Sequence, residues 1–174
     1  MKRSLALVLV LLAVAPSATK ARGMSSWISY LHDRREDEHA IREMIDASTV
    51  AWNAGDAVGY VAVFDPDATF TTAVGATLVG KKAFQAYSDE LLHTIFRASH
   101  LAQAVAEVRF VSKDIVLLDI ETRLTDFAAL PAGLKPSPDG SLHTRLEEVV
   151  VRSLGGWRVI SFHDVDEKVP PSPS

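Results

Sequence analysis

Two apolar stretches rich in β-branched residues lie near the C-terminal end of the chain, at residues 142–154 and 157–166. Between them stands Gly155-Gly156, which predicts a two-residue hairpin turn because both glycines can take positive φ. In this register Glu147 faces Asp164 across the hairpin, on the side that carries Val149 and Phe162. Both faces are apolar in the middle, so the pattern predicts that both are covered.

The apolar pattern changes period along the chain. Apolar residues recur at helical spacing over residues 37–54, 56–64 and 81–96, and then alternate over residues 98–110 and 115–126. Asp56 can cap the helix at 56–64, and a short strand is also expected at 69–73. Helices followed by long antiparallel strands predict an α+β fold, with the helices on one face of a bent sheet. In strand 98–110 we expect His100, Ala102 and Ala104 to face the concave side.

The N-terminal residues have the features of a secretory signal peptide. Lys2 and Arg3 precede an apolar run over 5–15, and small residues follow it. The run is shorter than the roughly 20 residues that span a bilayer, although an uncleaved anchor is the alternative. We therefore expect a signal peptide at 1–22, a leader at 23–35, one domain at 36–168 and a disordered tail at 169–174. The mature protein is then periplasmic or secreted and not bound to membrane.

Composition narrows the possible partners. The chain of 174 residues is 48% hydrophobic and 23% charged, as in ordinary globular proteins. Its net charge of −4 and the absence of a basic run argue against nucleic acid. Because there is no cysteine, disulfides and a cysteine-linked lipid anchor are excluded.

Four short motifs suggest a family. They are AWNAGD at 51–56, FDPDATF at 64–70, LVGKKAF at 78–84 and GGWRVISFHDV at 155–165. In order and spacing the chain resembles the nuclear-transport-factor-two-like superfamily, also called SnoaL-like or the cystatin-like cone. It is most similar there to SgcJ/EcaC-type bacterial proteins and to the association (hub) domain of calcium/calmodulin-dependent protein kinase.

The resemblance implies a curved antiparallel sheet wrapped round N-terminal helices, with a cone-shaped pocket between them. It also implies dimers or rings made through the sheet. Superfamily members include ketosteroid isomerases, scytalone dehydratases, polyketide cyclases and binding or assembly modules. The fold therefore does not select one function.

His100 and Asp164 are the candidate catalytic residues. His100 lies where several related pockets also carry a histidine, and an imidazole can serve as general acid or base near neutral pH. Its alternative is a strand-entry histidine bonded to the backbone. Asp164 beside Glu147 would have a raised pKa, which suits acid–base work, unless Arg145 neutralises the pair. The alternative for Asp164 is a strand-end carboxylate in solvent.

The expected pocket wall consists of side chains from the helices and the sheet. By this resemblance, Trp52 and Asn53 occupy the positions at which the dehydratase branch carries a catalytic tyrosine and a catalytic aspartate. Because Trp52 lacks a phenol and Asn53 cannot ionise, a dehydratase-like mechanism is disfavoured. No zinc spacing, phosphate loop or dinucleotide fingerprint is present, and we predict neither metal nor cofactor. The predicted ligand-binding residues are Trp52, Asn53, Ile120, Arg145, Glu147 and Phe162.

Three functional hypotheses remain open. The first is an exported protein that binds a small, mainly apolar molecule in the cone. The second is a cofactor-independent isomerase, lyase or cyclase that uses His100 with Asp164 or Glu147 for proton transfer. The third is an assembly module. We also expect a homodimer through the sheet, because the hairpin register leaves an uncovered apolar face with Val150, Leu154, Trp157 and Val159.

Overall fold

The computed structural model describes the backbone of residues 18–167 and the side chains of residues 33–167. The chain divides into two units between Glu36 and Asp37, and helix α1 (Ala18–Asn53) contributes to both. Within the described residues, no helix combines the length and apolar character needed to cross a membrane. Most of the predicted signal peptide and the whole predicted tail lie outside the described residues, so both stay predictions.

The second unit contains every other helix and strand that is described. Asp56 caps α2, its side chain accepting a hydrogen bond from the Gly59 amide at 2.9 Å, as the sequence predicts. In chain order the elements are α2 (Ala57–Tyr60), the 3-10 turn η1 (Val61–Val63), β1 (Phe64–Thr71), β2 (Thr77–Val79), α3 (Lys81–His93), β3 (His100–Phe110), β4 (Ile115–Thr125), β5 (Leu142–Ser153) and β6 (Gly156–Asp166).

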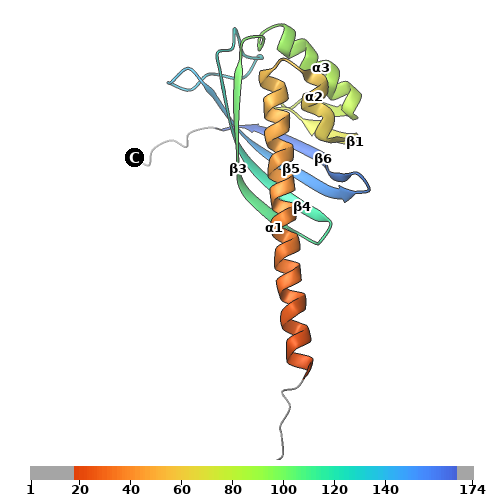
Figure 1. The fold of residues 1–174 in the computed structure, drawn as a ribbon. Coiled ribbons are helices and arrows are strands. Elements are labelled where there is room, and N and C mark those ends of the chain that lie inside the picture. Colours follow the sequence, from red (N-terminus) through yellow and green to blue (C-terminus); the bar gives the residue numbers. More distant parts are fainter. Residues whose placement is uncertain (1–17, 168–174) are drawn as a thin grey trace, which may run out of the picture. The chain divides into compact units, whose positions relative to one another are not determined.

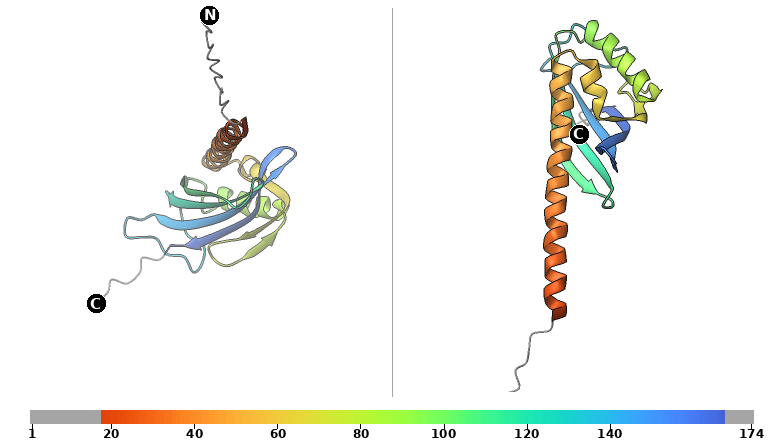
Figure 2. Two further views of the ribbon diagram at one scale, coloured as in Figure 1. Left: turned by 90° about the horizontal axis from the view of Figure 1, so that it is seen from below. Right: turned by 45° about the vertical axis from the view of Figure 1, so that its right-hand side comes forward.

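The strands form one six-stranded sheet in the order β2-β1-β6-β5-β4-β3. All neighbours are antiparallel except β1 and β6, which run parallel. The helices of this unit lie against one face of the curved sheet, which we call the inner face (Figures 1 and 2). The predicted α+β architecture is confirmed, and so is the alternation along β4, where Val116, Leu118 and Ile120 are fully buried.

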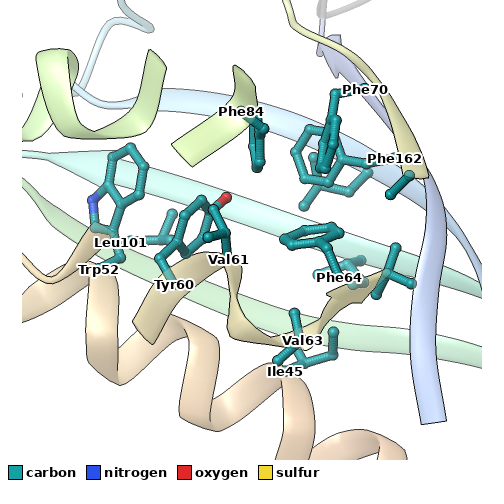
Figure 3. Packing of buried hydrophobic residues seen from close by; sticks show 14 of the residues in the cluster. Ile45, Trp52, Tyr60, Val61, Val63, Phe64, Phe70, Phe84, Leu101 and Phe162 are labelled. Atoms are coloured by element: carbon teal, nitrogen blue, oxygen red, sulfur yellow. The ribbon is translucent and has the colours of Figure 1, made fainter. Parts of the chain in front are cut away.

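An aromatic cluster joins the helices to the inner face of the sheet (Figure 3). Phe70 of β1 stacks on Phe84 of α3 with ring centroids 3.9 Å apart. Phe162 of β6 lies 5.3 Å from the same Phe84 ring. Tyr60 of α2 packs edge-on against Trp52 at 4.9 Å. These contacts fix α2 and α3 over the β1–β6 end of the sheet and leave space beside them.

Strand β3 turns a different face inward from the predicted one. Asn53 holds both backbone groups of Leu101, donating to its carbonyl at 2.9 Å and accepting from its amide at 2.7 Å. Leu101 is buried, whereas His100 and Ala102 are exposed. The expectation that His100 points into the concave side is therefore wrong. A bulge at Ala106 then reverses the alternation for the rest of the strand.

The hairpin of β5 and β6 is also shifted from the predicted register. Ser153 pairs with Gly156, so the turn residues are Leu154 and Gly155, and the positive φ of +102° falls at Gly156. Asp164 lies opposite Leu146 instead of Glu147. A bulge at residue 160 restores the inward position of residues 162 and 164.

Two predictions fail because of this shift. Glu147 and Val149 lie on the outer face of the sheet, and Glu148 lies on the inner face with 3% of its surface exposed. Val150, Trp157 and Val159 are core residues and not an uncovered apolar face. Charged substitutions there would disrupt the core and would not test association. The homodimer itself stays a prediction.

Candidate functional site

A cavity of about 110 Å³ lies between the helices and the inner face of the sheet. Its rim includes the exposed Val74 in the loop after β1, with Pro131 and Leu134 from the loop between β4 and β5. Most of its wall is aromatic or aliphatic. The lining residues are Trp52, Tyr60, Thr72, Ala73, Val74, Phe84, Tyr87, Ser88, Leu91, Phe96, Leu101, Gln103, Thr122, Leu124, Pro131, Leu134, Leu142, Thr144, Leu146, Phe162 and Asp164.

Among the described residues, Asp164 is the single charged residue in this lining, and no lysine, arginine or histidine accompanies it. Its Oδ1 atom is buried and has no hydrogen-bond partner. Burial raises the pKa of Asp164 to about 6, and the charge of Asp166 acts in the same direction. Hydrogen bonds from Thr144 and from the Val165 amide oppose that rise in pKa. Asp164 is therefore an acid–base group near neutral pH, with one buried oxygen that no protein group satisfies.

Two tyrosines line the same cavity. Burial, followed by the charges of Glu148 and Asp164, raises the pKa of Tyr60 far above its ordinary value. Burial also raises the pKa of Tyr87, against a hydrogen bond with Thr72 that lowers it. Both phenols stay protonated at neutral pH. They therefore act as hydrogen-bond donors and not as bases.

Glu148 is a second buried carboxyl on the inner face, outside the cavity lining. It lies opposite Phe162 on β6 and Leu118 on β4. Its Oε2 atom is buried without a hydrogen-bond partner, and burial raises the pKa of Glu148 to about 8. At neutral pH the side chain is therefore a neutral acid held in the core.

The structure brings together three of the predicted site residues. Asp164, Trp52 and Phe162 all line the cavity, and the Trp52 ring Nε1 donates to Ser99 Oγ at 3.2 Å. Ile120 is fully buried behind the lining, and Asn53 serves to anchor β3. Neither is a wall residue as predicted.

The other three predicted residues lie away from the cavity. His100 is exposed at the start of β3, and Glu147 is exposed on the outer face. Arg145, on the same outer face, binds Asp119 with two hydrogen bonds of 2.5 and 2.7 Å and Glu121 with one of 2.9 Å. Arg145 therefore neutralises outer-face carboxylates and does not reach Asp164.

Sequence reasoning did not identify Tyr60 and Tyr87 as phenols that line the cavity. It also missed Glu148. A signal for Glu148 was present, because Glu147 and Glu148 are adjacent in an apolar strand, and one of two adjacent strand residues must face the helices in any register. The described residues contain no group of three metal-ligating side chains that could hold an ion.

Comparison with known proteins agrees with this fold. Residues 41–165 match the model of the SnoaL-like domain. This chain belongs to the SnoaL-like domain family. No curated protein matches it. The finer resemblance to SgcJ/EcaC-type proteins stays a prediction.

Several solved structures are similar to this protein over most of its chain. A cystatin-like domain of unknown function from Nostoc punctiforme is 27% identical, with a TM-score of 0.65, and the match covers 78% of this chain and 80% of that one. A ketosteroid isomerase-like protein from Erwinia carotovora atroseptica is 17% identical, with a TM-score of 0.59 and coverages of 75% and 96%. A candidate calcium/calmodulin-dependent protein kinase II association domain from Xanthomonas campestris is 14% identical, with a TM-score of 0.56 and coverages of 73% and 85%. The last two show a shared fold alone.

Proposed function

We propose that this SnoaL-like domain binds a small, mainly apolar molecule in the cavity, with one polar group of that molecule held by Asp164. The observation that carries the proposal is Asp164, a carboxyl with an unpartnered Oδ1 atom, in a wall that is mostly apolar. A concave apolar site with few convergent polar groups is typical of small-molecule sites.

The energetics of the wall support the same function. A buried polar atom without a hydrogen bond costs on the order of 1–3 kcal/mol. A ligand that donates a hydrogen bond to Asp164 would recover part of that free energy. Tyr60 and Tyr87 can donate to an acceptor on the same ligand, since both phenols are protonated.

A cavity-filling variant tests whether this cavity is the binding site. Leu91 lines the cavity from α3, and Leu91→Trp adds bulk inside it. Val165→Trp adds bulk on the outer face, where Val165 is 61% exposed, and serves as the matched control. We expect toluene binding, followed by NMR chemical shifts, to weaken at least about tenfold in Leu91→Trp alone. Equal binding by both variants would contradict the proposal. Mass spectrometry of molecules that copurify with the native protein would then identify the natural ligand.

A second candidate function is cofactor-independent proton transfer by Asp164. Its raised pKa of about 6 lets it exist as either acid or base near neutral pH, and its side chain lies in the cavity wall. This hypothesis replaces the predicted pair with His100 or Glu147, since neither lies at the cavity. Turnover of a carbonyl or halogenated test substrate should be lost in Asp164→Asn and retained in His100→Ala. Turnover that survives Asp164→Asn would exclude it.

We also retain export and self-association as proposals. Export rests on the basic and apolar N-terminal sequence, and N-terminal sequencing of protein from native cells would test it. A homodimer would have to use the outer face, where Arg109, Arg145, Glu107 and Glu147 mix both charge signs round a shallow depression. Light scattering at micromolar concentration that gives a monomer mass would exclude it, and with it the assembly-module hypothesis.

A further inference from the structure

We propose that the cavity selects a small amine that is cationic at neutral pH, with its ammonium group against Asp164 and its apolar body among the aromatic side chains. This inference rests on the ligand binding proposed above and names the chemical class of the ligand. It follows from the balance of charge inside the cavity and from the chemistry of its wall.

The charge balance of the cavity is negative and uncompensated. Within residues 33–167, whose side chains the structure describes, Asp164 is the sole charged lining residue, and no lysine, arginine or histidine lines the cavity with it. A carboxylate with a pKa of about 6 is mostly ionised at pH 7.5. Buried charges in proteins are ordinarily paired, so the missing positive charge is the group that a ligand would supply.

The groups that surround Asp164 do not supply that charge. Tyr60 of α2 and Tyr87 of α3 are neutral phenols, and Thr144 of β5 contributes a hydroxyl. Asp166 on β6 adds further negative charge. The lining residues from β3 and β4 include Gln103 and Thr122 but no titratable side chain. Every titratable neighbour is therefore either neutral or of the same sign as Asp164.

The wall beside Asp164 is unusually rich in aromatic rings. Trp52 and Phe96 approach to 6.0 Å between centroids, and Phe84 lies 5.3 Å from Phe162. An ammonium within about 6 Å of a ring face is attracted by the ring quadrupole, and Trp and Tyr faces are the strongest for this contact. Among the described lining residues, six are aromatic: Trp52, Tyr60, Phe84, Tyr87, Phe96 and Phe162.

A cation fits this cavity better than the other ligand classes. An anion would be repelled by Asp164 and would find no cationic side chain in the lining. The body of a neutral alcohol would pack against the apolar wall, but its hydroxyl would leave the charge of Asp164 uncompensated. An amine would both compensate the charge of Asp164 and meet the aromatic side chains of the wall.

The test compares three probes of nearly equal shape on the purified full chain: benzylamine, benzyl alcohol and benzoate. Binding is measured by calorimetric titration at pH 7.5 and at pH 5. At pH 7.5 we expect benzylamine to bind at least about tenfold more tightly than benzyl alcohol, with benzoate weakest. At pH 5 benzylamine is still cationic while Asp164 is mostly protonated, so the preference should fall below about threefold.

Variants localise the effect. Asp164→Asn should remove the preference for benzylamine at pH 7.5, and Glu147→Gln, which deletes the same charge from the outer face, should leave it unchanged. The wild-type pH series keeps the inference testable if Asp164→Asn does not fold. Equal binding of benzylamine and benzyl alcohol at pH 7.5 would overturn the amine class while leaving small-molecule binding in place. A failure of all three probes and of toluene would overturn both proposals.

Discussion

The two faces of the sheet treat their charged residues in opposite ways. On the outer face, Arg145 bridges Asp119 and Glu121, and Arg123 bonds Asp139 at 3.1 Å, all in contact with solvent. Hydrogen bonds from Ser141, with a further one from Arg123, hold the pKa of Asp139 below its usual range. On the inner face, Glu148 and Asp164 each keep a buried oxygen with no partner, and the pKa of each is raised.

This difference indicates that the unfavourable electrostatic free energy of the fold lies mainly in the buried carboxyls of the inner face. Exposed ion pairs gain little free energy and lose little when broken, because water solvates each partner. A buried carboxyl without a partner instead destabilises its charged form by the whole loss of hydration. The inner face should therefore control both ligand chemistry and the pH dependence of stability, and the outer face should control neither.

The largest expected loss of stability comes from truncating a large side chain that packs against the inner face. Trp52→Ala should lower the free energy of unfolding by about 3–5 kcal/mol, because a large buried aromatic leaves a cavity when truncated. Val165→Ala on the outer face should change it by less than about 0.5 kcal/mol, since Val165 is 61% exposed. Urea titration measures both. Similar losses for the two variants would mean that Trp52 is not part of the packed wall.

Glu148 should make stability fall as pH rises. Its pKa is about 8 in the folded chain against the ordinary value of 4.5, so between these values the native state binds a proton that the unfolded state has lost. Between pH 6 and pH 8 the loss should be about 2 kcal/mol.

Replacing Glu148 with glutamine tests that dependence. Glu148→Gln should flatten the pH profile of unfolding and make the protein more stable than wild type at pH 8. Glu147→Gln on the outer face is the control and should keep the wild-type slope. If the Glu148→Gln profile were as steep as the wild-type profile, Glu148 would not be the cause of the pH dependence of stability.

Asp164 should give a smaller effect of the same sign. Its pKa of about 6 lies above the ordinary 3.8, so its contribution to stability is lost as pH rises from about 4 to about 6. Because the side chain is only partly buried, Asp164→Asn should stabilise the fold at pH 7 by about 1–2 kcal/mol. Thermal unfolding checks the direction. A less stable Asp164→Asn would show that the carboxylate is a structural group and not one reserved for a ligand.

The smallest effect is expected on the outer face. Arg145→Met breaks the bonds to Asp119 and Glu121, but both carboxylates remain accessible to water. The denaturation midpoint should move less than in any inner-face variant above, and the difference from wild type should shrink in 1 M salt. A loss comparable with that of Trp52→Ala would mean that outer-face pairs stabilise the sheet and that the contrast between the faces is wrong.

The sequence by itself determined the order and type of the elements. Helical spacing, the Asp56 cap and the alternation over β4 each depend on residues close together in the chain, and each is found in the structure. Trp52 and Phe162 were predicted as ligand-binding residues and Asp164 as a catalytic one, and all three line the cavity. Four motifs in order were sufficient to indicate the superfamily.

Tertiary structure alone decided which residues of β3, β5 and β6 face the helices. Strand side chains alternate with a period of two, so one shifted turn residue or one bulge moves a whole set to the other face. A turn at Leu154 and Gly155 and a turn at Gly155 and Gly156 are both locally reasonable, and the bulges at residues 106 and 160 have no local signature. The choice is made by burying Trp157 and Val159 and by the bonds of Asn53 to Leu101. That choice placed Glu148 inside, left His100 and Glu147 in solvent, and made Asp164 the sole charge among the described residues that line the cavity.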